Sequence, residues 1–369
     1  MNTSTQLLSK DRKEGTTPDT IKILKAGQGD SIIISFTDDS NCRRNILIDG
    51  GNKKTEYENN LRQEVLQIAS RNEKIDLLII THIDQDHIKG INYLISDFEN
   101  PKIIFNESIV CEYWFNSSKS IAQSSKFNEE LDISFQDMQF IEKFLKNKTD
   151  KWQNKISSFR TVDFYNSKIT ILTPNLETLN NFIQKYPVLD ISDKGSDYNF
   201  SLQELSLSEI KKKNEGKEEL DTNLENATSI SFLFEYKDKK ILFLGDAIPI
   251  EVENGIKKIL EERKLEKLVV DYIKLSHHGS RKSISYNFFN LIECSDYIIS
   301  TNGTKCKLPN KATFSKILMN TNRKSDSTIN FHFNYPSFSN NLKFTTEEKI
   351  HLKFNCFDSN YHNGLIITI

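Results

Sequence analysis

The chain has 369 residues, enough for one large domain or two of ordinary size, and 37% of them are hydrophobic, enough for a substantial core. Its 49 basic and 51 acidic side chains give a formal net charge of −2, which excludes a global positive field for holding nucleic acid. Any polyanion would therefore have to be bound by a local basic surface.

The N-terminal segment, the apolar runs and the cysteines indicate where the protein is located. Residues 1–19 are polar and lack the apolar stretch of a secretory signal, so we expect a flexible N-terminal segment. No run approaches the roughly 20 apolar residues that span a bilayer. The five cysteines are odd in number and widely spaced, which is typical of reduced thiols in a cytoplasmic protein. The sequence therefore predicts a cytoplasmic protein with no membrane association.

The first hundred residues predict strands and helices in the order β-β-β-α-β-α. Short β-branched or apolar runs separated by glycine-rich or polar turns are typical of strands. These runs cover residues 21–24, 31–36, 45–48 and 75–80, and a fifth predicted strand follows at 102–105. Apolar residues at helical spacing predict helices over 61–68 and 88–98.

Two polar segments interrupt this pattern, and we interpret both as insertions. The first covers about 107–160 and contains a predicted helix at 129–145. The second, about 188–224, is rich in charge and serine and predicts a mobile loop. A strand at 168–173 and a short helix before residue 186 lie between them.

From residue 228 the α/β pattern returns and predicts a second half of the same domain. The predicted strands are 229–236, 241–244, 269–275 and 297–300, and the predicted helices are 250–262, a segment after 283, and 311–319. We therefore expect one domain over 20–325, with C-terminal strands at 326–369 packed on it.

Four of the seven histidines fall in two places, at His82 and His87 and at His277 and His278. Residues 82–87, with the sequence HIDQDH, follow the apolar strand 75–80 and precede a helix. Imidazole suits zinc and other first-row metals, and carboxylates add oxygen donors that can bridge two ions. A helix start capped by Asp86, with incidental histidines, is the alternative. The spacing favours a metal site.

The HIDQDH run resembles the His-x-His-x-Asp-His signature of the metallo-β-lactamase superfamily, with Asp84 in place of the second histidine. Other segments follow in that family's order and look like the hydrolase domain of bacterial competence DNA-uptake (ComEC-like) proteins. They are AGQGDS at 26–31, ILIDGG at 46–51, NATS at 226–229, LGD at 244–246, KLSHHGS at 274–280 and STNG at 300–303. The resemblance covers roughly residues 21–318.

This resemblance implies an α/β fold, the metallo-β-lactamase αββα four-layer sandwich, here with two internal insertions. It makes His82 and Asp84 ligands of a first metal, Asp86 and His87 ligands of a second, and Asp246 the bridge between them. One residue of the pair at 277–278 would complete the second position, and we favour His278 as the ligand and His277 as an outer contact or substrate contact.

The chain departs from the family pattern at two points. The superfamily supplies a further histidine between the first motif and the bridging aspartate, yet none exists between His87 and His277. The first metal then lacks a ligand unless it is replaced, and the sequence leaves Asp221, Glu225 and Asn226 as candidates. ComEC-like relatives carry a His-Pro pair where this chain has Leu308 and Pro309.

The resemblance points to a nuclease or phosphodiesterase that uses one or two Zn²⁺ or Mn²⁺ ions and a metal-activated water. Its catalytic residues would be Asp86, His277 and Lys274, with Ser280 and Lys89 as further phosphate contacts and nucleic acid or another phosphodiester as partner. Because this fold hosts many chemistries, hydrolysis of a small ester, thioester or lactone is the competing hypothesis, which a substrate panel separates. A degraded site acting as a binding module is the third, and metal content distinguishes it.

Overall fold

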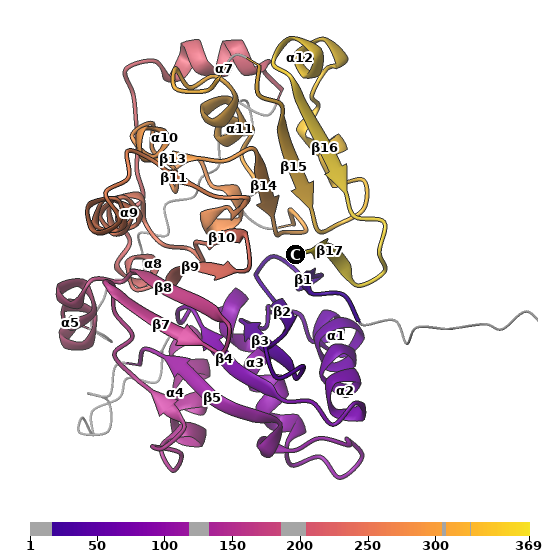
Figure 1. The fold of residues 1–369 in the computed structure, drawn as a ribbon. Coiled ribbons are helices and arrows are strands. Elements are labelled where there is room, and N and C mark those ends of the chain that lie inside the picture. Colours follow the sequence, from indigo (N-terminus) through magenta and orange to yellow (C-terminus); the bar gives the residue numbers. More distant parts are fainter. Residues whose placement is uncertain (1–16, 118–132, 186–203, 305–307, 325) are drawn as a thin grey trace, which may run out of the picture.

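A computed structural model describes residues 17–117, 133–185, 204–304, 308–324 and 326–369 of the chain (Figure 1). The predicted flexible N-terminus falls mostly on residues 1–16, outside this description. In the described part no helix combines the length and the apolar character needed to cross a membrane.

A seven-stranded sheet forms one half of the molecule, with the strand order β17-β1-β2-β3-β4-β5-β6. Strands β17 to β3 pair antiparallel, and β3 to β6 pair parallel. The strands are β1 (Thr20–Leu24), β2 (Ile32–Thr37), β3 (Arg43–Ile48), β4 (Ile75–Ile80), β5 (Val110–Phe115), β6 (Trp152–Gln153) and β17 (Gly364–Thr368).

An eight-stranded sheet forms the other half, with the order β16-β15-β14-β12-β10-β9-β8-β7. Strands β7 to β10 pair antiparallel, and β10, β12, β14, β15 and β16 pair parallel. They are β7 (Arg160–Phe164), β8 (Ser167–Thr173), β9 (Ser231–Tyr236), β10 (Lys239–Phe243), β12 (Tyr272–Lys274), β14 (Asp296–Ile299), β15 (Ile329–Phe333) and β16 (Phe354–Asp358). A separate pair joins β11 (Leu268–Val269) to β13 (Ile292–Glu293).

Helices pack on the outer faces of the two sheets. The first sheet carries α1 (Lys54–Glu56), the π-helical turn Tyr57–Leu61, α2 (Arg62–Ser70), α3 (Gln85–Asp97) and α4 (Ile133–Leu145). The second carries α9 (Pro249–Arg263), α10 (Phe288–Leu291) and α11 (Lys311–Leu318). The remaining helices are α5 (Leu176–Lys185), α7 (Leu207–Asn214), α8 (Leu224–Ala227), α12 (Thr346–His351) and the 3₁₀ turns Glu107–Ile109, Ser276–Gly279 and Phe338–Leu342.

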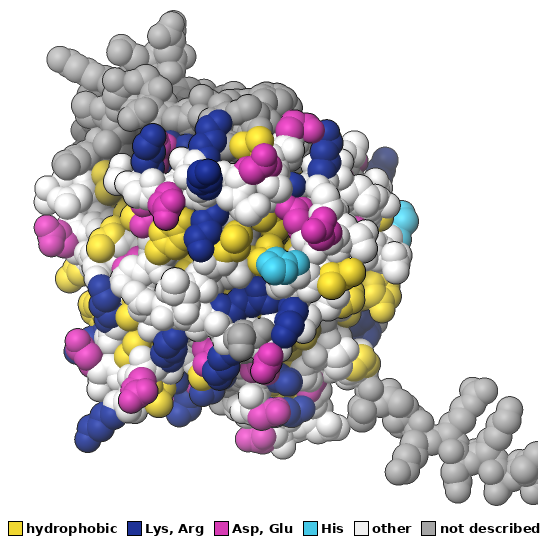
Figure 2. All heavy atoms as spheres, turned by 90° about the horizontal axis from the view of Figure 1, so that it is seen from above, with side chains coloured by type: hydrophobic (Ala, Val, Ile, Leu, Met, Phe, Trp, Pro, Cys, Tyr) yellow, Lys and Arg dark blue, Asp and Glu magenta, His cyan; other side chains and the backbone are white. Residues whose placement is uncertain are grey.

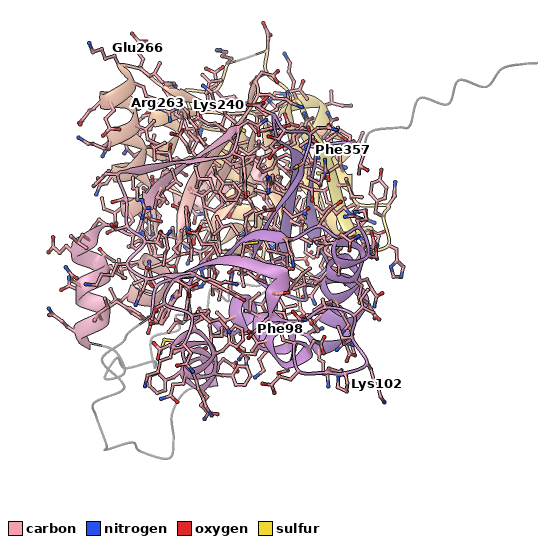
Figure 3. The ribbon with its side chains drawn as sticks, turned by 60° about the horizontal axis from the view of Figure 1, so that its bottom comes forward. Phe98, Lys102, Lys240, Arg263, Glu266 and Phe357 are labelled. Carbon is pink, nitrogen blue, oxygen red and sulfur yellow. The ribbon has the colours of Figure 1, made fainter. Side chains whose placement is uncertain are left out.

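Strand β4 shows why the sheets stack. Its side chains alternate in direction, so Leu77 and Ile79 pack between the two sheets while Leu78 and Ile80 pack under the helices. Because both faces are covered, all six residues of β4 are buried. Figure 3 shows side chains filling these layers, with Phe98 just after α3 and Arg263 at the end of α9 on opposite sides of the molecule. The architecture is therefore the four-layer αββα sandwich.

The structure corrects three predicted boundaries. The segment 107–160 is not simply an insertion, because β5 and β6 extend the first sheet and α4 packs against α3. Residues 102–105 form a turn and not a strand. In the segment 188–224, the described residues from 204 onward include α7, which begins with a capping box at Ser206 and packs against α11; they are therefore not all loop.

The predicted C-terminal strands at 326–369 exist, and they are integral to the sheets. β15 and β16 extend the second sheet, and β17 crosses to the first sheet to pair with β1.

Candidate metal centre

The predicted site residues meet where strands of both sheets end. β4 leads to His82, β10 leads to Asp246, and β12 leads to His277 and His278. Loops at the carboxyl ends of parallel strands are where α/β folds build their sites. Residues more than 190 positions apart in the sequence are thereby brought together.

The HIDQDH run joins β4 to α3. The residue before the helix is Asp84, whose side chain makes no capping hydrogen bond, and Asp86 lies in the first turn. The capping interpretation of Asp86 is therefore wrong. A side chain on Gly29 would collide with this turn, because its Cβ would lie 1.5 Å from the Asp86 carbonyl oxygen. This close approach holds the AGQGDS loop directly against the ligand run.

The carboxylate of Asp246 is the centre of the cluster. Its Oδ1 lies 3.3 Å from His87 Nε2, and its Oδ2 lies 3.8 Å from His82 Nε2 and 3.7 Å from His278 Nε2. Two ligands of one tetrahedral zinc ion, each about 2.0–2.1 Å from it, are about 3.3 Å apart. The observed spacing is therefore close to that of a metal centre.

Two more carboxylates border the cluster. Asp86 Oδ2 lies 3.4 Å from His278 Nε2, and Asp84 Oδ2 lies 3.8 Å from His82 Nε2. The tightest groups of ligand atoms, all within 4.8 Å of one another, include His82, His87 and Asp246 in one set and Asp86, His87 and His278 in another.

Each buried histidine is oriented through its Nδ1 atom. His87 Nδ1 lies 2.8 Å from Asp49 Oδ2, His278 Nδ1 lies 2.9 Å from the Ser300 carbonyl oxygen, and His82 Nδ1 lies 3.0 Å from Thr81 Oγ1. Asp49 also accepts hydrogen bonds from Thr81. Partners of this kind fix the tautomer of a metal-binding histidine and leave Nε2 for the ion.

The inward-facing atoms have no hydrogen-bond partner. His82 Nε2, His87 Nε2, His278 Nε2 and Asp246 Oδ1 are all buried, and none has a hydrogen-bond partner in the described structure. Buried polar atoms are normally satisfied, so a set of orphans pointing at one place needs an explanation. A bound cation satisfies all four, and the donor set of imidazoles and carboxylates fits Zn²⁺ or Mn²⁺.

Burial and charge shift the pKa values of these groups in opposite directions. Burial, reinforced by the nearby His87, lowers the pKa of His82 to about 4. Burial also opposes the charged form of His278, but the carboxylates of Asp246, Asp30 and Asp86 outweigh it and raise its pKa to about 9. The histidines in turn hold the pKa of Asp246 well below its usual range, although burial alone would raise it. Shifts of this size are typical of functional sites.

Lys274 requires a correction, because we predicted that it contacts a phosphate. Its side chain is 1% exposed, and its ammonium pairs with the buried Asp30 carboxylate beneath the site. Asp30 Oδ1 lies 3.6 Å from His278 Nδ1, so the lysine supports the ligand shell from behind. The prediction failed because the partner that buries Lys274 lies 244 positions earlier in the sequence.

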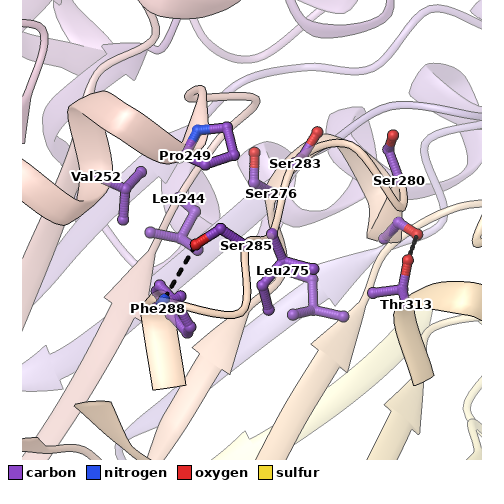
Figure 4. Close-up of a pocket in the computed structure, with 12 residues that line it drawn as sticks. Leu244, Pro249, Val252, Leu275, Ser276, Ser280, Ser283, Ser285, Phe288 and Thr313 are labelled. Atoms are coloured by element: carbon purple, nitrogen blue, oxygen red, sulfur yellow. Dashed lines mark hydrogen bonds between the residues drawn. The ribbon is translucent and has the colours of Figure 1, made fainter. Parts of the chain in front are cut away.

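The other predicted phosphate contacts are also engaged elsewhere. Lys89 pairs with Asp137 of α4 at 2.6 Å. Ser280 is 1% exposed and lines a small pocket between the 276–285 segment and α9 (Figure 4). On the walls of that pocket Thr313 Oγ1 donates to the Gly279 carbonyl oxygen, and the Phe288 amide donates to Ser285 Oγ. None of the predicted metal ligands lines it.

Two of the three candidates for replacing the missing histidine, Asp221 and Asn226, lie beside His277. Asn226 Nδ2 donates to Asp221 Oδ2 at 2.7 Å, and Asp221 Oδ2 lies 3.6 Å from His277 Nδ1. We did not predict this association, since nothing in the sequence links the loop before α8 to the turn after β12.

Residues 24–142 match the model of the Metallo-beta-lactamase superfamily, a stretch that runs from the end of β1 into α4 and includes the HIDQDH run. With the four layers described above, this match decides the fold. The chain has the metallo-β-lactamase fold. No curated protein matches the sequence.

The solved structures that match this chain do so at low identity and low TM-score. The metallo-β-lactamase fold protein YhfI from Bacillus subtilis is 8% identical with a TM-score of 0.41, over 95% of this chain and 99% of that one. Zn²⁺-bound PqqB from Methylobacterium extorquens is 11% identical with a TM-score of 0.40, over 95% and 100%. CmlA, a diiron β-hydroxylase from Streptomyces venezuelae, is 10% identical with a TM-score of 0.39, and this chain spans 55% of it. At these values the solved structures do not bear on the activity of this chain.

Proposed function

We propose that the protein is a metal-dependent hydrolase that cleaves phosphodiesters. The observation that carries the proposal is the convergence of buried ligand atoms of His82, His87, His278 and Asp246 that have no hydrogen-bond partner in the described structure, with Asp84 and Asp86 beside them. When bound, two divalent ions supply Lewis acidity and a water of lowered pKa at such a site.

Residues of the chain orient the ligands and leave one histidine accessible. Asp49 and the Ser300 carbonyl oxygen hold the imidazoles of His87 and His278 in place. Asp246 spans the cluster with both of its oxygens. His277, whose side chain is 31% exposed, is the histidine of the cluster most accessible to a substrate.

The choice of a phosphodiester rests on the carboxylate-rich ligand set, in which Asp84 takes the place of a histidine and which resembles phosphodiester-directed relatives. Basic and acidic side chains are interspersed on the face shown in Figure 2, in keeping with the formal charge of −2. Binding of a polynucleotide would then neutralise few phosphates and depend only weakly on salt. With Lys274 buried, we assign any phosphate contact to Lys282, which follows the His277–His278 turn and is partly exposed; the neighbouring Arg281 pairs with Glu219 at 2.8 Å.

The test is a substrate panel with Mn²⁺ and Zn²⁺ each supplied, after elemental analysis of the purified protein. We expect one or two bound ions and cleavage of bis-p-nitrophenyl phosphate, and we then compare single- and double-stranded DNA with RNA. Lys282→Ala should weaken polynucleotide cleavage more than cleavage of the small diester, with Lys343→Ala, which replaces an exposed lysine paired with Glu204, as control. Turnover of a thioester or lactone without diester cleavage would favour the competing hypothesis, and absence of metal affinity would favour a binding module.

A further inference from the structure

We propose that His277 is the ligand that completes the first metal position, in place of the histidine that the sequence lacks between His87 and His277. The inference rests on the metal centre of the proposed function and is independent of the substrate. It assigns His82, Asp84 and His277 to one ion and Asp86, His87 and His278 to the other, with Asp246 shared.

The backbone explains how two consecutive residues can serve the same centre. In an extended strand the side chains of His277 and His278 would point to opposite faces. Here both have left-handed backbone angles, with φ of 46° and 53°, and Gly279 continues the turn with φ of 85°. Left-handed backbone at non-glycine residues costs about 1–2 kcal/mol each and persists where the surroundings enforce it. The His277 amide donates to the Gly245 carbonyl oxygen at 3.0 Å, which anchors the turn next to Asp246.

The two imidazoles consequently approach the same carboxylate with differently oriented rings. His277 Nε2 lies 4.0 Å and His278 Nε2 lies 3.7 Å from the same oxygen, Asp246 Oδ2. Their ring planes are 83° apart, with the ring centroids separated by 5.9 Å. Both rings are therefore within reach of an ion bound to Asp246, and we infer that they serve two ions that share this carboxylate.

The outer contacts of His277 follow the same pattern as those of the buried ligands. Its Nδ1 lies 3.6 Å from the acceptor Asp221 Oδ2, while the Asn226 amide nitrogen, 3.5 Å from that Nδ1, donates to the same carboxylate oxygen at 2.7 Å. A carboxylate at Nδ1 leaves Nε2 as the metal-binding atom, as Asp49 does for His87. Asp221 is thereby a positioning residue and not the replacement ligand itself.

The ligands of the first metal position are less closely grouped and more exposed than those of the second. His277 and Asp84 lie outside the tightest groups of ligand atoms, and their side chains are 31% and 29% exposed. Asp86 is 18% exposed and His87 and His278 are fully buried. We infer that the first position binds its ion more weakly than the second.

Asn226 is the main competitor for the role of His277. Its side chain is buried, and its Oδ1 atom has no hydrogen-bond partner in the described structure. Amide oxygens are, however, poorer partners than imidazole for zinc, which prefers nitrogen and sulfur donors. Substituting the two residues separately distinguishes them.

The experiment titrates the metal-free full chain with Zn²⁺ by calorimetry and counts bound ions by native mass spectrometry. The wild type should bind two ions with unequal affinity. His277→Ala should bind only the tighter ion, or bind the second at least about a hundredfold more weakly. Asn226→Ala should retain two ions, and His278→Ala should lose the tighter one. X-ray absorption of the Zn²⁺-loaded protein should show one imidazole fewer in His277→Ala.

One further variant and a folding control keep the result interpretable. His277→Cys supplies a thiolate that binds zinc and should retain the second Zn²⁺ ion, which a merely structural loss would not allow. A far-ultraviolet circular dichroism spectrum and thermal melt establish that each variant is folded. Two ions of unchanged affinity in His277→Ala, or loss of the second ion only in Asn226→Ala, would overturn the proposal. Failure to cleave diesters would leave these ion counts unchanged and would bear only on the proposed substrate.

Discussion

The two halves of the metal centre differ in how they are supported. The deep half, Asp86, His87 and His278, is held by Asp49, by the Ser300 carbonyl oxygen and by the Asp30–Lys274 pair, all buried between strand ends. The rim half contains Asp84 and His277, which are partly exposed, and its outer contacts come from Asp221 and Asn226 in the segment before β9.

This difference determines how much each set of ligands must be ordered when its ion binds. Ligands at the ends of packed strands are placed by the core, so little entropy is lost when an ion binds. Ligands on connecting segments must be ordered further by the ion itself. The deep half should therefore bind first and respond most strongly to substitution, and four predictions follow from largest effect to smallest.

The combined substitution Asp86→Ala and His87→Ala should reduce hydrolysis below detection. It removes two ligands of the deep position while sparing the core, because both residues lie after β4 at the start of α3. Steady-state assays on the best diester measure the loss, and circular dichroism and a thermal melt should stay close to the wild type. A double variant that is unfolded would show that these residues are structural.

Lys274→Met should destabilise the metal-free protein by roughly 3–5 kcal/mol, because it leaves the buried Asp30 carboxylate without its partner. Urea unfolding followed by fluorescence measures the change. Lys353→Ala is the matched control: its pair with Asp326 is exposed and should contribute about 1 kcal/mol or less. Equal effects in the two variants would show that Lys274 does not support the deep half.

Asp49→Asn should weaken binding of the tighter ion by roughly 10–100-fold, since it removes the carboxylate that orients His87. Asp221→Asn, the corresponding change at the rim, should act on the weaker ion and by less than about tenfold, because His277 is already partly exposed. Zinc titration of both variants compares them directly. If Asp221→Asn weakened zinc binding more than Asp49→Asn did, the rim half and not the deep half would hold the tighter ion.

Metal affinity should rise with pH, because an ion must displace a proton from His278. Its pKa is raised from 6.5 to about 9, so its proton stabilises the metal-free fold fully below pH 6.5, and this contribution is lost as pH rises through 9. The dissociation constant should then fall about tenfold per pH unit across this range for each proton released. His82, with its pKa lowered to about 4, has already lost its proton at neutral pH. A dissociation constant that is flat between pH 6.5 and 9 would contradict this prediction.

Local sequence was enough to predict the deep half in part. A fully apolar strand, then ligand-type residues, then an amphipathic helix determine how His82 and His87 are presented, and the structure has β4 and α3 there. By contrast, the sequence predicts that the residues of β5 belong to an insertion. It follows a polar turn and includes the exposed Cys111, so its alternation is weak.

The other features of the site could not be predicted, because they depend on contacts between residues far apart in the sequence or on unusual backbone angles. The burial of Lys274 depends on its ion pair with Asp30, which lies in the loop between β1 and β2 of the other sheet. The left-handed angles of His277 and His278 cannot be predicted from residue type, since histidine seldom adopts them. The sequence therefore could not show that both imidazoles face Asp246.

The pairing of β17 with β1 has a consequence for how the protein is made. Thr20 lies opposite Thr368, and Leu24 lies opposite Gly364, so one edge of β1 has no neighbour until the last of these residues leave the ribosome. During synthesis that edge presents unpaired amide and carbonyl groups, which readily pair with another chain. Closing so long a stretch of chain is also slow. We expect nascent chains of this protein to depend on chaperones until synthesis reaches residue 368, and release of a truncated chain to favour aggregation.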